Sequence, residues 1–392
     1  MTAGPRTSLL LDGAGHAHLY VIAHAHRLAA AGYGLTLLAP ADFRYSGMAS
    51  ASAVGALSLD AGRIDIVHLA RTHDVHHIDG RLVELDVRAH QATTDTGARL
   101  SWDVVSFNIG SVSATGGIED IEPGVLQVKP LADLATLSAR LRQAHIDADQ
   151  QGRRAAVTIV GGGSSGAELA GQLSARGAVT VRLVEAGPHL VSSVPSSARA
   201  YLRRLLSRRG VSIHTDSPVH RLAADHVLLS DGQTWTHDLA VLSTGLRADP
   251  LVSQLGLTDT DTDGSPTRAG VASPADSWLT DETPDGIPVS ATLQYLGASN
   301  VYAAGDCAHF TPSPLPKIGV HGVRQGPVLL DSLIRRAAGA ALPTYDPPPH
   351  PLQILDLGGG VALAAHGRRW WCGRTSLAAK RWIDKRWLTT YS

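Results

Sequence analysis

The sequence predicts an α/β protein in which one βαβ unit occurs twice. Each copy has an apolar strand, a glycine-rich turn, a helical stretch and a second apolar strand. The 40 glycines follow no collagen-like period and suit the tight turns of such a fold. The chain's 392 residues are enough for two or three domains.

The first copy starts near the N-terminus. Its expected elements are a strand at 9–12, the glycines Gly13 and Gly15, a helix at 19–31 and a strand at 35–38. His18 stands where a dinucleotide-binding turn has its third glycine, and the second strand ends in Ala39 and Pro40 without an acidic residue. This turn alone is therefore a weak sign of a nucleotide site.

The second copy is the stronger signal. Its expected elements are a strand at 157–160, the glycines Gly161, Gly163 and Gly166, a helix at 169–176 and a strand at 180–185. Such a turn binds a pyrophosphate, because free N–H groups and the helix dipole favour an anion there. Glu185 can accept hydrogen bonds from a ribose diol and would repel a 2′-phosphate. The unit therefore predicts NAD(H), with NADP(H) less favoured.

Other elements surround the two copies. Expected strands are 81–87, 91–96, 104–110, 211–214, 227–229, 239–242 and 301–304, and expected helices are 131–149, 198–209 and 319–336. Residues 258–285 are rich in Asp, Thr, Pro and Gly and are interpreted as a surface insertion of unassigned role. The strand at 301–304 ends in Gly305 and Asp306, and an aspartate so placed can bind the ribityl chain of a flavin.

The predicted fold class is therefore α/β, with two nested Rossmann-like dinucleotide-binding domains (FAD and NAD) and a small C-terminal α+β region. The first part of the FAD-binding domain is expected at 1–128 and its second part at 251–345. The NAD(H)-binding domain is expected at 129–250. Residues 346–392 form the C-terminal region, with a basic amphipathic helix.

Three segments resemble a known family. Gly15-His16-Ala17-His18, Tyr45-Ser46-Gly47-Met48 and the run 316–327 are similar to the flavoprotein module fused to some selenide, water dikinases. That module belongs to the pyridine nucleotide-disulfide oxidoreductase superfamily and is related to type II NADH dehydrogenases and sulfide:quinone oxidoreductases. His18 is part of that subgroup's own pattern, which supports a flavin site despite the missing glycine.

The motifs and the resemblance together give the candidate site residues. The candidate FAD contacts are Gly13, Gly15, His16, Tyr45, Ser46, Gly47, Val83, Gly110, Gly305, Asp306 and Lys317, and the candidate NAD contacts are Gly161, Gly163, Gly166, Glu185 and Gly245. The resemblance implies catalytic roles for Glu168 near the two rings, Lys317 at the flavin pyrimidine edge and Gln325 at the acceptor site. Alternatively, Lys317 is a solvated surface lysine, and Glu168 is stabilised only by the helix dipole.

The implied activity is hydride transfer from NADH to the flavin N5, followed by electron transfer to a quinone-like or other small acceptor. One alternative is a dinucleotide-binding or regulatory flavoprotein with impaired turnover. Another is a flavoenzyme acting on a sulfur or selenium species. Cys307 and Cys372 lack the arrangement of a redox pair facing a flavin, and Cys307 is expected to be a small packed residue.

Net charge, histidine spacing and the length of apolar runs argue against several kinds of partner and site. A formal net charge of -1 argues against nucleic acid. No metal site is expected, because the His-x-His spacings of the early histidines do not place both rings on one helical face. No apolar run is long enough to span a bilayer, so a cytoplasmic protein is expected.

The C-terminal segment 377–388 leaves two alternatives open. It is basic and aromatic, with Ala379, Ile383 and Trp387 on one helical face, which suits peripheral contact at the inner face of a membrane. The same helix could instead pack on the protein body or on the second subunit of a homodimer.

Overall fold

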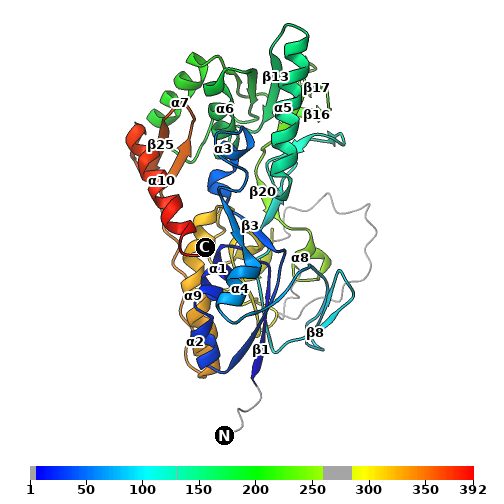
Figure 1. Cartoon of the computed structure of the whole chain (residues 1–392), viewed down its shortest axis with the longest axis vertical. Coiled ribbons are helices and arrows are strands. Elements are labelled where there is room, and N and C mark those ends of the chain that lie inside the picture. The colour runs from blue at the N-terminus through cyan, green and yellow to red at the C-terminus, as the bar shows by residue number, and fades with distance from the viewer. Residues whose placement is uncertain (1–5, 130, 259–284) are drawn as a thin grey trace.

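The computed structural model describes residues 6–129, 131–258 and 285–392 (Figure 1). Nearly all of the expected insertion at 258–285 lies outside these described residues. The chain forms two halves, each built on a parallel sheet, and a C-terminal piece at their side (Figure 1). The predicted fold class is confirmed.

The first half contains a parallel sheet of five strands in the order β22-β9-β1-β2-β5. These are β1 (Thr7–Asp12), β2 (Tyr33–Leu38), β5 (His76–Ile78), β9 (Val104–Phe107) and β22 (Val301–Ala303). Helices α1 (His16–Ala23), α2 (Ala25–Ala30) and α9 (Gly319–Ala337) pack together beside it. The helix expected at 19–31 is two helices, because the backbone leaves the helical conformation at His24. The sheet thus combines both ends of the chain.

Smaller elements complete this half. They are β3 (Asp42–Arg44), β4 (Arg63–Asp65), α4 (Ile66–Thr72), β6 (Leu82–Asp86), β7 (Gln91–Thr94), β8 (Arg99–Ser101), α8 (Leu251–Gln254), β21 (Ile287–Val289), the 3₁₀ turn η3 (Gly305–Cys307) and β23 (Ala308–Phe310). Strands β6, β7 and β8 form an antiparallel sheet of their own.

The second half repeats the pattern in the order β12-β19-β13-β14-β15, all parallel. Its elements are β12 (Leu126–Gln127), η2 (Leu131–Asp133), α5 (Leu134–Gln150), β13 (Ala155–Val160), α6 (Ser164–Arg176), β14 (Val179–Val184), α7 (Ser196–Arg208), β15 (Ser212–His214) and β19 (Leu239–Leu242). A second sheet combines β11 (Asp120–Ile121), β16 (Val219–Leu222), β17 (His226–Leu229) and β18 (Thr234–Thr236).

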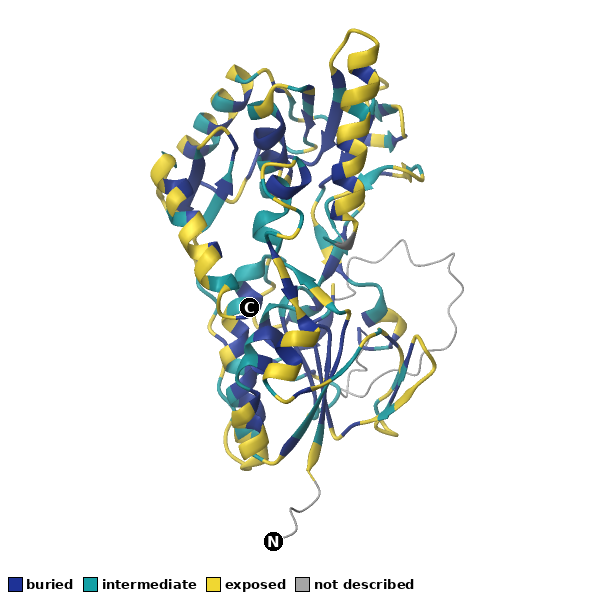
Figure 2. Ribbon diagram, in the orientation of Figure 1, coloured by how far each residue is buried: buried dark blue, intermediate teal, exposed yellow. Residues whose placement is uncertain are grey.

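Two connections join the halves. Strands β10 (Ser111–Ser113) and β20 (Leu246–Ala248) pair antiparallel where the chain passes between them. The turn η1 (Ser46–Met48) and helix α3 (Ala49–Ala53) leave the first half, and α3 packs on α5 and α6 of the second. Each half has its own apolar core, and buried residues concentrate in the central strands (Figure 2).

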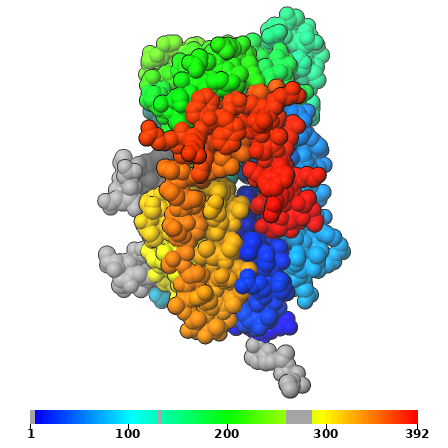
Figure 3. Space-filling view, turned by 90° about the vertical axis from the view of Figure 1, so that its left-hand side faces the viewer, coloured from blue at the N-terminus to red at the C-terminus, as the bar shows by residue number. Residues whose placement is uncertain are grey.

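The C-terminal piece is an antiparallel sheet followed by a helix. It comprises β24 (Gln353–Asp356), β25 (Ala362–His366), β26 (Arg369–Gly373) and α10 (Arg374–Leu388). The sheet packs against α6 and α7, while α10 runs from the second half toward the first (Figure 3). This piece therefore contacts the second half through its sheet and extends toward the first half through α10.

Candidate functional site

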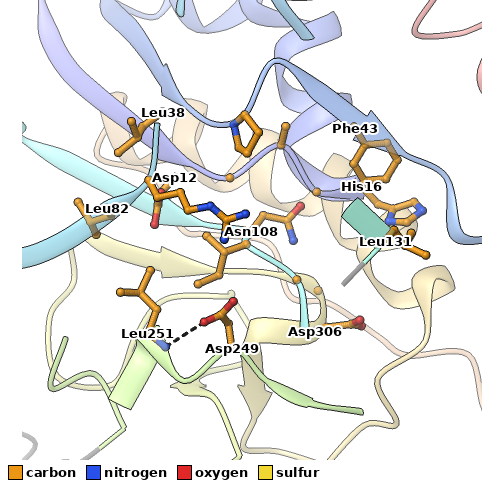
Figure 4. A pocket seen from close by; sticks show the side chains of 18 of the residues that line it. Asp12, His16, Leu38, Phe43, Leu82, Asn108, Leu131, Asp249, Leu251 and Asp306 are labelled. Carbon is orange, nitrogen blue, oxygen red and sulfur yellow. Dashed lines mark hydrogen bonds between the residues drawn. The ribbon is translucent and has the colours of Figure 1, made fainter. Parts of the chain in front are cut away.

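A cavity of about 460 Å³ opens at the carboxyl ends of β1 and β2 (Figure 4). The predicted FAD contacts among its lining residues are Gly13, Gly15, His16, Ser46, Val83, Gly110, Gly305 and Asp306. Tyr45 adjoins the lining through its neighbour Ser46. One surface of described residues therefore collects most of the candidates from 1–128 and 251–345.

The first glycine turn is held by Asn108, which follows β9. Asn108 Oδ1 accepts hydrogen bonds from the N–H groups of Ala17 (2.9 Å) and His18 (3.2 Å) at the start of α1. A side chain at Gly13 or Gly15 would collide with Asn108, because their Cβ atoms would lie 2.7 and 2.5 Å from its oxygens. Asn108 was not predicted, since the contact joins positions about ninety residues apart.

His18 fills the place of the third glycine. Its Nδ1 lies 2.6 Å from the Gly13 carbonyl oxygen and its Nε2 lies 2.8 Å from Ser106 Oγ. In the second half, a Cβ at Gly166 would collide with the Gly161 carbonyl oxygen, so the helix there approaches too closely for a side chain. Burial lowers the pKa of His18 to about 4, so the imidazole is neutral. In the first turn the hydrogen-bonded His18 ring thus lies where, in the second turn, the helix approaches the Gly161 carbonyl closely.

Asp306 lies at one end of the cavity and forms an ion pair that the sequence did not reveal. Its Oδ2 accepts hydrogen bonds from Ser111 Oγ (2.6 Å) and Lys129 Nζ (3.0 Å). Burial acts to raise the pKa of Asp306, but Lys129 and Ser111 outweigh it and hold the pKa below its ordinary value. Lys129 therefore supplies positive charge inside this cavity.

Lys317 and Gln325 lie elsewhere in the described structure. Lys317 Nζ donates to the carbonyl oxygens of Asp306 (2.6 Å) and Asp285 (2.9 Å) and does not line the first cavity. Gln325 is buried, and its Oε1 accepts a hydrogen bond from Gly305 N–H at 2.6 Å. Both side chains hold the backbone around Asp306, and their predicted catalytic roles remain predictions.

The second glycine turn adjoins a smaller cavity of about 80 Å³ lined by Gly161, Glu185 and Thr244, among others. Gly161 has a φ of 110° and Gly163 is the residue before helix α6. The Glu185 carboxylate accepts hydrogen bonds from Gly162 N–H (2.6 Å) and Gly187 N–H (2.8 Å). Gly245, which follows β19, turns the chain with a φ of 119°. The backbone of this turn thus engages both oxygens of the Glu185 carboxylate, and the predicted NAD contacts of Gly161, Gly163 and Glu185 remain predictions.

A further cavity of about 380 Å³ lies between η1, α3, β24 and α10. Lys380 Nζ in its lining donates to Gly47 O (2.6 Å) and to Asp384 Oδ2 (2.7 Å). Tyr45 Oη donates to Asp384 Oδ1 at 3.0 Å. Lys380 and Asp384 have side chains that are only 9% exposed. A buried ion pair thus joins α10 to the segment that carries Tyr45.

Glu168, near the start of α6, is close enough to Lys380 and Asp384 for their charges to act on its pKa. Its Oε1 accepts a hydrogen bond from Asp356 N–H at 2.8 Å. Desolvation raises the pKa of Glu168 to about 7, although Lys380 acts in the opposite direction. The carboxyl therefore holds a proton for part of the time at neutral pH.

The face of helix α10 that packs against the protein is not the face that the spacing of its apolar residues predicted. Its buried residues include Leu377, Lys380 and Asp384, while Ile383 is exposed. Trp387 points inward, with its ring centroid 4.6 Å from that of Tyr45 and 5.0 Å from that of His16. The expected common face of Ala379, Ile383 and Trp387 is therefore split.

Neither cysteine lies at these cavities. Cys307 is fully buried, and burial raises the pKa of its thiol to about 12, so it is a packed residue, as expected. Cys372 is on β26. The described residues contain no cluster of His, Cys, Asp and Glu that could hold a metal ion. None of the described helices is both long and apolar enough to cross a bilayer.

The sequence model of the pyridine nucleotide-disulphide oxidoreductase family matches residues 12–326. The chain belongs to this family. FAD and NAD(H) are accordingly its cofactors, in agreement with the paired turns.

Curated relatives are similar over part of the chain. An internal alternative NAD(P)H-ubiquinone oxidoreductase of Solanum tuberosum mitochondria is 28% identical over 45% of this chain and 34% of its own length. A demethylphylloquinone reductase of Synechocystis sp. is 26% identical over 53% of this chain and 47% of its own. The matches thus span about a third to a half of these relatives.

Solved structures share the fold over nearly the whole chain. NDH2 of Plasmodium falciparum, in complex with NADH, has a TM-score of 0.79 and 12% identity, covering 98% of this chain and 97% of that one. A sulfide:quinone oxidoreductase of Aquifex aeolicus has a TM-score of 0.75 and 14% identity, covering 97% and 90%. At these identities the likeness concerns the fold alone.

Proposed function

We propose that this protein is an NAD(P)H oxidoreductase that oxidises NADH through FAD and reduces a small quinone-class acceptor. One observation carries the proposal: two cavities adjoin each other, because two consecutive residues line one cavity each. Ser46 lines the cavity of the first glycine turn, and Gly47 lines the cavity beneath α10. An electron carrier in the first cavity would therefore lie beside a substrate in the second.

The first cavity fits FAD in its chemistry. The N–H groups of the turn that Asn108 does not engage, at Ala14 and His16, would meet the pyrophosphate, and Asp306 would accept hydrogen bonds from the ribityl hydroxyls. Lys129 would place a positive charge near the ring system, where negative charge develops on reduction. When bound, FAD supplies hydride acceptance from NADH and electron release to a second substrate.

The acceptor cavity suits a molecule with an apolar body and a polar, proton-accepting head. Met48, Ala51, Leu57, Leu377 and Leu388 supply apolar lining. Lys380 has three N–H donors, and the described acceptors Gly47 O and Asp384 Oδ2 account for two of them. The third can donate to a carbonyl oxygen of the acceptor, and Glu168 nearby can hold a proton at neutral pH.

Names of the curated relatives support the acceptor class, since several are named as ubiquinone oxidoreductases or as a demethylphylloquinone reductase. No specific observation favours chemistry on sulfur or selenium, because neither cysteine lines the two cavities in the described structure. A quinone therefore has more support than a persulfide.

The proposed activity is tested by steady-state oxidation of NADH with a panel of acceptors. We expect a short-chain ubiquinone or a naphthoquinone to sustain turnover, and cysteine persulfide or selenite to give only background rates. Turnover with the sulfur or selenium acceptors alone would contradict the quinone assignment. Flavin reduction by NADH without turnover of any acceptor in the panel would point to another acceptor. Retained flavin that NADH does not reduce would favour a binding or regulatory role.

We also propose that the outer face of α10 contacts a membrane surface. Trp382 is 62% exposed, with the Arg386 guanidinium 5.4 Å from its ring centre, and Ile383 and Lys385 are exposed beside it. Exposed aromatic and apolar residues among cations are typical of helices that lie in a membrane interface. Such contact would bring a membrane quinone to the α10 cavity.

A further inference from the structure

Asp12, the last residue of β1, is an unexplained carboxylate inside the first cavity. It is 2% exposed, and its Oδ2 has no hydrogen-bond partner in the described structure. A buried carboxylate without a partner is costly, so a residue of this kind is expected to have a partner that arrives with a ligand. Asp12 lines the first cavity, so a ligand can reach it.

The second half of the molecule shows what Asp12 replaces. In the paired registers, Asp12 lies opposite Leu38 of β2, and Val160 lies opposite Val184 of β14. The second half thus has an apolar residue before its glycine turn and an acid, Glu185, after its second strand. The first half has the reverse, because β2 is followed by Ala39 and Pro40. Its acid stands on the neighbouring strand, about 4.8 Å across the sheet, and one residue earlier in the register than Ala39, the counterpart of Glu185.

Asp12 lies at the end of the cavity that is remote from the flavin ring. Figure 4 shows Asp12 with Leu38 and Leu82 at one end and Asp306 at the other, with Asn108 between them. His16 lies at the same end as Asp306, and its ring contacts Tyr45 and Trp387 of α10. A dinucleotide that spans the turn with its ring at that end places its adenosine half beside Asp12.

The groups that face Asp12 limit what it can bind. Burial raises the pKa of Asp12, the nearby Asp249 raises it further, and Arg81 acts to lower it. Asp249 Oδ1 already accepts a hydrogen bond from Leu251 N–H at 3.0 Å. Two carboxylates would repel a phosphate, so the matching ligand group is an uncharged donor such as a hydroxyl.

We propose that Asp12 Oδ2 accepts a hydrogen bond from a ribose hydroxyl of the adenosine half of FAD, and that this contact takes over the role of the missing acid after β2. The inference rests on the proposed function only in that FAD occupies the first cavity. It makes Asp12 the residue that distinguishes FAD from FMN, which has no adenosine half.

The test is flavin binding to protein freed of flavin, measured as quenching of flavin fluorescence with FAD and with FMN. Asp12→Leu copies the apolar residue of the second half, and Asp12→Asn keeps one acceptor oxygen. We expect the dissociation constant for FAD to rise by about 10- to 100-fold in Asp12→Leu and less in Asp12→Asn. FMN binding should stay unchanged in both. Asp103→Asn, at the opposite end of the same sheet, is the matched control.

A second readout separates this role from a structural one. Removing the unpaired carboxylate should raise the unfolding midpoint of flavin-free Asp12→Leu, although FAD binding weakens. The proposal is overturned if Asp12→Leu binds FAD as tightly as the wild type does, or if FAD and FMN binding weaken equally. Weakened wild-type binding of the hypoxanthine analogue of FAD, to the level of FMN, would assign the contact to the adenine amine and overturn the ribose assignment.

The proposed function can fail independently of this inference. FAD that binds in an Asp12-dependent manner but is not reduced by NADH would refute the activity and leave the adenosine contact standing. Wild-type protein that binds neither FAD nor FMN would refute both.

Discussion

Charged side chains around both cavities are largely buried, where a charge is costly without a partner. Lys129 with Asp306 and Lys380 with Asp384 are largely buried pairs, each hydrogen-bonded to at least one further group. Buried pairs seldom add net stability over apolar residues of similar size, so their retention is better explained by a task. We propose that these two pairs present cations to a flavin and to its acceptor.

The Lys380–Asp384 pair gives a prediction that separates stability from function. Lys380→Met should lower the free energy of unfolding by about 3 kcal/mol, because it leaves the Asp384 carboxylate buried without its cation. The double variant Lys380→Met with Asp384→Leu should recover most of that stability in urea denaturation. It should still oxidise reduced flavin with quinone more slowly than the wild type. Full recovery of both properties would refute a role for Lys380 at the acceptor.

Glu168 predicts a pH dependence. Its pKa of about 7 lies above the ordinary 4.5, so its proton is present below pH 7 and lost above it. Reoxidation of reduced flavin by quinone, followed by stopped flow, should slow as the pH rises through about 7. Glu168→Gln should remove this step in the profile. An unchanged profile in Glu168→Gln would assign the titration to another group.

The same raised pKa affects stability with a definite sign. The folded protein holds the Glu168 proton more tightly than the unfolded chain does. Its contribution therefore favours folding below an ordinary pKa of 4.5 and is lost as the pH rises through about 7.

At the scale of elements, the sequence was sufficient where a pattern is local. Strands β1, β13 and β14 and the turns after β1 and β13 were predicted, because strand periodicity and glycine spacing are contained within a few residues. Asn108, Lys129 and the Lys380–Gly47 contact were not, because they join positions far apart in the chain. Their signal would have been a polar residue in an otherwise apolar setting, as at Asp12.

Helix α10 is a case in which a local pattern led to a wrong prediction. Apolar spacing alone assigned Ala379, Ile383 and Trp387 to one face, but the inward face carries Lys380 and Asp384. The ion pair between Lys380 and Asp384 and the hydrogen bond from the Tyr45 hydroxyl compensate for the cost of burying these charges. A pattern of hydrophobic residues does not reveal such compensation.

The outer face of α10 predicts membrane binding. The protein should co-sediment with vesicles containing anionic phospholipid, and less so at high salt, because exposed Arg381, Lys385 and Arg386 would meet lipid charge. Trp382→Ser with Ile383→Ser should weaken binding about 10-fold or more without changing NADH oxidation by a soluble quinone. Equal sedimentation of the wild type and this variant would refute contact through α10. Leu352→Ser, exposed on another segment, is the control.

For the whole molecule, the arrangement of the two halves decides the chemistry. Each parallel sheet presents its glycine turn at the carboxyl ends of its strands, and β10 with β20 joins the halves between those turns. Helix α10 then extends from the second half to Tyr45 and His16 of the first. We propose that two dinucleotides held by these turns bring their reactive rings together at this junction.

We propose that electrons pass between two dinucleotides held by these turns. Anaerobic titration of the FAD-loaded protein with NADH, followed by the flavin absorbance band, tests it most directly. We predict complete bleaching at about one NADH per flavin, with NADPH slower because Glu185 would repel its 2′-phosphate. A flavin that stays oxidised for minutes in excess NADH and NADPH would contradict the claim.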